Sequence, residues 1–171
     1  RLSRYAVYVG GGLLLFSAVM VGFEVVGRKV FNFSFRGVDE VSGYIFGIIT
    51  AWAFSFALYR RNHVRIDALY VHLPHRVRCL LDITALASLA IVFSLLAHQS
   101  VGVFAESVRI GAEANTPLRT PLWIPQIFWL TGLWFFLINI YILLVRTVWA
   151  LLQGNFDLIR SIAAAPSLKE E

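Results

Sequence analysis

Hydrophobic residues run along this chain in four long stretches, and charged residues gather between them. The uncharged runs cover residues 5–23, 41–59, 83–105 and 120–145. An α-helix needs about 20 apolar residues to cross the hydrocarbon core of a bilayer, so each run is long enough for one span. The pattern predicts an all-α integral membrane protein with four transmembrane helices. We expect these helices at about 5–29, 39–60, 77–112 and 120–152.

A shorter amphipathic segment lies between the second and third spans. Ile66, Leu69 and Leu73 recur there at helical spacing, while charged residues and histidines fill much of the remainder. A short, one-sided helix with basic flanks lies in the membrane interface and does not cross it. We therefore predict an interfacial arm helix at about 64–73. Pro74 ends this arm and can open the next helix.

The other two connections are shorter and carry turn residues. Residues 30–37 contain Asn32 and Gly37, which favour a turn, and several phenylalanines suited to the interface. Asp39 and Glu40 then open the second span, as acidic residues often do at a helix N-terminus. Three prolines in residues 115–125 break the chain before the fourth span. Because the helical pattern of the third span continues into residues 104–114, we expect that helix to project beyond the lipid.

The distribution of basic residues predicts the orientation. Ten of the 15 lysines and arginines fall on the side that holds both termini and the arm. These ten are Arg1, Arg4, Arg60, Arg61, Arg65, Arg76, Arg78, Arg146, Arg160 and Lys169. Cytoplasmic loops carry the excess of basic residues, so both termini are predicted to be cytoplasmic. Residues 1–153 then form a single four-helix membrane domain, and residues 154–171 form a cytoplasmic tail.

Composition supports a membrane protein and argues against nucleic-acid binding. The chain is 58% hydrophobic and only 15% charged, with a mean hydropathy of +0.72. Soluble domains are nearer a quarter charged. The net charge of +5 fits cytoplasmic loop charge, and the basic residues form no nucleic-acid motif. Cys79 is the one cysteine, so an internal disulfide is impossible.

Charged residues gather where the first two spans meet. Glu24 and Arg28 are spaced i, i+4 and can pair along one helix face. Arg28 can also meet Glu40 across the turn, and Asp39 lies next to it. Two interpretations stay open at this point: the cluster clamps the first two spans together, or it contacts another protein.

The sequence contains no pattern typical of catalysis or of cofactor binding. His98 is the one histidine inside a span, whereas a membrane haem needs axial ligands from facing spans. With Gln99 and Ser100 it forms a polar triplet, for which hydrogen bonding between helices is the default account. The middles of the four runs stay apolar, which argues against a transport pathway within this chain alone. We therefore expect neither an enzyme nor an autonomous carrier, and no cofactor.

An ordered set of residues resembles a known family. In chain order the set comprises Glu24, Arg28, Phe31, Asp39 and Glu40, Trp52, His63 to Asp67, Leu73 and Pro74, and Thr120 to Pro125. It resembles the small membrane subunit, the Q (DctQ-type) component, of tripartite ATP-independent periplasmic (TRAP) transporters, over about residues 5–149.

The resemblance implies a function and a set of partners. Such transporters lie in the bacterial inner membrane and import organic acids with a sodium gradient and a soluble periplasmic binding protein. The large membrane (M) subunit carries the substrate and sodium sites and moves as an elevator. The small subunit adds four spans and a horizontal arm to the static scaffold, and its outer face contacts the binding protein transiently.

On this interpretation the expected site residues are structural or contact a partner or lipid. They are Glu24, Arg28, Asp39, Glu40, Trp52, His63, Ile66, Asp67, Leu69, Leu73, Trp123 and Pro125. Two alternatives of other classes remain at this stage. One is a membrane-anchor subunit of a redox enzyme, and the other is a small carrier that works alone.

Overall fold

The computed structural model describes residues 2–33, 37–59 and 74–153, and it is built from four long α-helices. They are α1 (Leu2–Val30), α2 (Val38–Tyr59), α4 (His75–Arg109) and α5 (Trp123–Leu152). All four are long and apolar enough to cross a membrane. The prediction of an all-α, four-span protein is therefore confirmed. The predicted arm, with His63, Ile66, Asp67, Leu69 and Leu73, lies outside the described residues.

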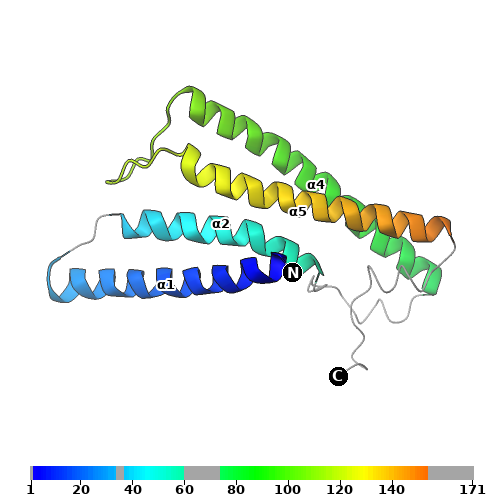
Figure 1. Cartoon of the computed structure of the whole chain (residues 1–171), viewed down its shortest axis with the longest axis horizontal. Coiled ribbons are helices and arrows are strands. Elements are labelled where there is room, and N and C mark those ends of the chain that lie inside the picture. Colours follow the sequence, from blue (N-terminus) through cyan, green and yellow to red (C-terminus); the bar gives the residue numbers. More distant parts are fainter. Residues whose placement is uncertain (1, 34–36, 60–73, 154–171) are drawn as a thin grey trace, which may run out of the picture.

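The helices form two hairpins, whose most extensive contact with each other is between α2 and α5. α1 packs against α2, α5 packs against α4, and α2 packs against α5. In Figure 1 the helices follow the order α1, α2, α5 and α4 where the loops join α1 to α2 and α4 to α5, and α4 crosses α5 toward the opposite end. The contact between α2 and α5, which we call the seam, therefore holds the hairpins together.

The connection between α1 and α2 uses backbone conformations that few residues adopt. Asn32 has φ 53° and Gly37 has φ 96°. Asparagine and glycine tolerate this left-handed region best, as the sequence suggested. At Gly37 a Cβ atom would also lie 2.2 Å from Cδ1 of Leu118, a residue of the loop between α4 and α5. The two connections at this end of the molecule therefore touch, and we call it the turn end.

The loop between α4 and α5 is longer than the sequence indicated. α4 ends at Arg109, and Gly111 follows at φ 61°, a common helix termination. α5 begins at Trp123 instead of about residue 120, because the chain first forms an isolated bridge between Glu113 and Pro121. The Ala114 N–H donates to the Thr120 carbonyl at 3.0 Å, and the Leu122 N–H donates to the Ala112 carbonyl at 2.9 Å. Residues 110–122 thus form an ordered loop.

The best-packed core lies between α2, α4 and α5. Its largest cluster consists of Leu58, Leu86, Ala90, Phe136, Ile140 and Leu143. Phe136 lies at its centre, with ring centroids 4.6 Å from Phe93 and 5.4 Å from Phe54. α1, by contrast, exposes most of its apolar side chains, and Leu15 is 71% exposed. Only a membrane or a protein partner can cover such a surface.

Candidate functional site

Hydrogen bonds of polar side chains join the two hairpins at three places, which we call ties. The first tie lies at the turn end. Glu40, in the first turn of α2, is 9% exposed. Its Oε1 accepts a hydrogen bond from the Tyr44 hydroxyl at 2.8 Å, one turn further along the same helix. Its Oε2 accepts from the Thr116 hydroxyl, in the loop between α4 and α5. Glu40 therefore attaches that loop to α2.

The second tie joins the two helices directly. Trp52 of α2 donates its indole N–H to the backbone carbonyl of Phe128 at 3.1 Å, and its ring stacks on Phe135 with centroids 5.6 Å apart. Gly132 of α5 makes room for this indole, because a Cβ atom there would lie 2.6 Å from Trp52 Cδ1. Trp52, expected to be structural, thus lies where α2 and α5 approach each other closely.

The third tie is a buried amide further along the seam. Asn139 of α5 is 6% exposed, and its Oδ1 accepts from the Tyr59 hydroxyl at 2.6 Å. Its Nδ2 donates to the Phe135 carbonyl at 2.7 Å and lies 3.4 Å from the buried Ser55 hydroxyl. Hydrogen bonds of this kind hold helices together where lipid offers no alternative partner.

The charged cluster at the end of α1 forms one of the two pairs considered from the sequence. Arg28 Nη2 lies 2.7 Å from Glu24 Oε1, and Glu24 itself is only 1% exposed. The other pair, between Arg28 and Glu40, does not form, because the Glu40 carboxylate bonds to Tyr44 and Thr116 instead. The Glu24–Arg28 pair therefore joins two residues of α1, and Glu40 links α2 to the loop between α4 and α5.

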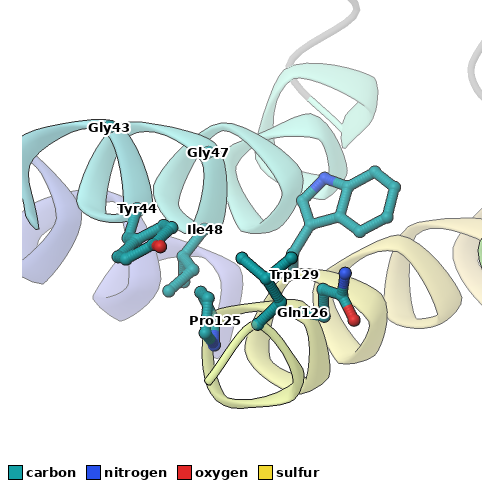
Figure 2. Close-up of a pocket in the computed structure, with 8 residues that line it drawn as sticks. Gly43, Tyr44, Gly47, Ile48, Pro125, Gln126 and Trp129 are labelled. Atoms are coloured by element: carbon teal, nitrogen blue, oxygen red, sulfur yellow. The ribbon is translucent and has the colours of Figure 1, made fainter. Parts of the chain in front are cut away.

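A pocket of about 380 Å³ opens beside the seam, close to the turn end. Figure 2 shows Tyr44 and Ile48 of α2 opposite Pro125 at the start of α5. Gly43, Gly47, Leu122, Gln126 and Trp129 complete the lining. None of these lining residues is charged, and the pocket surface is mainly apolar. It therefore offers no cation to bind the carboxylate of an organic acid.

The remaining expected residues lie at the turn end or on the surface. Asp39 is exposed, and its backbone carbonyl accepts from the Ser42 hydroxyl at 3.0 Å. Trp123 is exposed at the start of α5, and Pro125 lines the pocket. Within the described part of the chain, no three histidine, cysteine or acidic side chains come together as metal ligands.

Sequence reasoning missed several residues that make the contacts at the seam and at the turn end. Thr116 and Tyr44 bond to Glu40, Asn139 supplies the buried amide, and Gly132 makes room for Trp52. Two signals were available. Asn139 interrupts an otherwise apolar stretch of the fourth span, and Gly132 is a single small residue among bulky ones. Neither signal alone identifies the contacting residue on α2.

Four helices that can span a membrane, polar ties that join them and an apolar pocket define a multi-pass integral membrane protein. The family model described as "Tripartite ATP-independent periplasmic transporters, DctQ component" matches residues 17–151. The chain belongs to this family and is a small (Q) membrane subunit of a TRAP transporter. No curated protein and no solved structure matches the chain.

Family membership establishes the general role. This is a multi-pass component of a membrane transporter, in a family that works with a larger M subunit and a periplasmic binding protein. The match confirms the resemblance found in the sequence. The alternative of a redox-enzyme anchor has no support, because the matched family is a transporter component.

Proposed function

We propose that this chain is the static scaffold subunit of a sodium-driven transporter that imports organic acids. It stabilises the large, elevator-type M subunit in the bacterial inner membrane and does not itself hold the substrate site. A periplasmic binding protein delivers the substrate and contacts the turn end transiently. Both termini, the arm and the tail face the cytoplasm, and Glu24, Arg28 and Glu40 lie near the periplasmic surface.

The observation that carries the scaffold role is the seam. Its three ties lie at successive levels of α2, from Glu40 through Trp52 to Tyr59. Together with the core between α2, α4 and α5, these ties hold the two hairpins in one relative position. A subunit held in this way suits a fixed support against which another domain moves.

The character of the pocket supports a substrate site elsewhere. Binding of a carboxylate at membrane depth calls for arginine, lysine or helix N-terminal N–H groups directed at the anion. The described pocket is lined by glycines, aromatic and aliphatic side chains and one glutamine. This pocket has no cationic side chain, which supports a substrate site on a partner subunit.

Purification and reconstitution test the proposal. The chain is co-expressed with the M subunit, and an affinity tag on the M subunit is used to recover the complex in mild detergent. We expect the small subunit to co-purify and sodium-driven uptake in liposomes to require both membrane subunits and the binding protein. Uptake by liposomes that contain this chain alone would overturn the proposal.

A further inference from the structure

Two polar side chains in the middle of α4 point away from the rest of the molecule. His98 and Gln99 are both exposed, whereas the neighbouring Ser100 is buried and donates to the Leu96 carbonyl at 2.6 Å. α4 contacts α5 on its opposite side (Figure 1). Their helical positions place His98 and Gln99 beside Leu95, which is 64% exposed.

These polar groups lie at the depth of the lipid chains. His98 and Gln99 belong to the uncharged run 83–105, within the span Val77–Arg109. Glu106 is eight positions further along from His98, which corresponds to about 12 Å along a helix. Neither His98 nor Gln99 forms a hydrogen bond with the described residues. Lipid chains cannot provide one, and such groups in membranes almost always face protein or water.

A glycine on the same face permits close approach by another backbone. Gly102 is one turn beyond His98, and a Cβ atom built there would meet nothing within 4 Å. Other helical glycines are equally open, namely Gly11, Gly12, Gly22, Gly43 and Gly47. What distinguishes Gly102 is its place beside His98 and Gln99. Small residues allow helix backbones to approach each other in membranes, so an unused glycine beside unbonded polar groups indicates an external helix.

We propose that the face of α4 formed by Ile91, Leu95, His98, Gln99 and Gly102 binds a transmembrane helix of the M subunit. That helix carries a hydrogen-bonding side chain at the level of His98 and Gln99. This inference rests on the proposed function, because it identifies the contact surface of the scaffold. It also gives the polar triplet a role: His98 and Gln99 bond between subunits, whereas Ser100 bonds within α4.

Leucine substitutions distinguish a protein neighbour from lipid by the sign of their effect. If this face met lipid, His98→Leu with Gln99→Leu would leave assembly unchanged or improve it. Against a polar partner helix, the double variant loses hydrogen bonds and leaves the partner group unsatisfied. We expect about tenfold weaker association with the M subunit, measured by recovery of the small subunit on the tagged M subunit. The control is Thr131→Leu, because the exposed Thr131 hydroxyl bonds only to the Phe128 carbonyl of its own helix.

A photo-crosslinking amino acid at Leu95 identifies the neighbour directly. In the co-expressed complex we expect an adduct with the M subunit, identified by mass spectrometry. If the complex forms but Leu95 crosslinks only to lipid or to a second copy of this chain, the inference is wrong and the proposed function stands. If the unmodified small subunit does not associate with the M subunit, the proposed function fails as well. Circular dichroism of the double variant checks that its helices are intact.

Discussion

At the scale of single residues, the closest packing in the seam depends on the missing side chain of Gly132. We predict that Gly132→Ala destabilises the isolated subunit by about 1–3 kcal/mol, because the new methyl group overlaps the Trp52 indole and pushes α2 and α5 apart. The free energy of unfolding in detergent micelles, followed by circular dichroism, measures the effect. Gly12→Ala is the matched control, since a Cβ atom there meets nothing within 4 Å. Equal stability of the two variants would show that the indole moves aside freely.

The buried amide of Asn139 makes a separate contribution. Asn139→Leu removes the hydrogen bond from Tyr59 and leaves the neighbouring Ser55 hydroxyl facing an aliphatic side chain. We expect a loss of about 1 kcal/mol for each bond between helices, again measured by unfolding in micelles. Thr131→Val is the control, because its hydroxyl bonds within one helix and links no neighbours. An unfolding free energy equal to that of the control would refute a role for Asn139 in pairing α2 with α5.

At the scale of elements, Glu40 determines how the loop of residues 110–122 sits on α2. Replacing Glu40 with alanine removes the acceptor for the Thr116 hydroxyl, while the loop's own backbone bonds remain. We predict faster amide hydrogen exchange and faster proteolysis in residues 110–122, with the four helices intact. Asp39→Ala is the matched control, because Asp39 is exposed and its backbone carbonyl, not its carboxylate, accepts from Ser42. Equal protection of the loop in both variants would contradict the proposed attachment.

The helices were predictable where the pattern of residues along the chain determines their positions. Four uncharged runs identify four spans because the thickness of a bilayer sets the length of each run. Proline and glycine located the connections, and Pro74 is indeed the N-cap residue of α4. The start of α5 was misplaced by about three residues, because the bridge between Glu113 and Pro121 competes with helix formation there.

The site was predictable only in part, because its contacts join residues far apart in the chain. The Glu24–Arg28 pair follows from a spacing of four within one helix. Glu40 was recognised as important, yet its partner Thr116 lies 76 positions away, and Asn139 lies 80 positions from Tyr59. No local pattern encodes such pairings. They depend on which helices become neighbours, and no sequence pattern places α2 beside α5.

At the scale of the whole molecule, the arrangement of the helices leaves large apolar surfaces open on α1 and α4. In the described part of the chain α1 has one extensive helix contact, with α2, and α4 has one, with α5, beside a smaller contact with α2 through Phe93 and Phe54. The apolar surfaces of both helices are consequently open, with Leu15 on α1 71% exposed and Leu95 on α4 64% exposed. Such an open arrangement presents more surface to a large partner than a compact bundle of the same length. This shape suits a support more than a self-contained carrier.

The orientation of the helices in the membrane determines which end of the molecule a periplasmic partner can reach. That orientation is predicted from the distribution of basic residues. We predict that the turn end is periplasmic. In a Cys79→Ala background, Glu113→Cys places a single thiol in the exposed loop, and Gln153→Cys places one just after α5. A membrane-impermeant maleimide added to spheroplasts should label the first variant at once and the second only after permeabilisation. An even number of spans returns the chain to its starting side, so reversed labelling would show that the whole molecule has the opposite orientation. The turn end would then be cytoplasmic and inaccessible to a periplasmic protein.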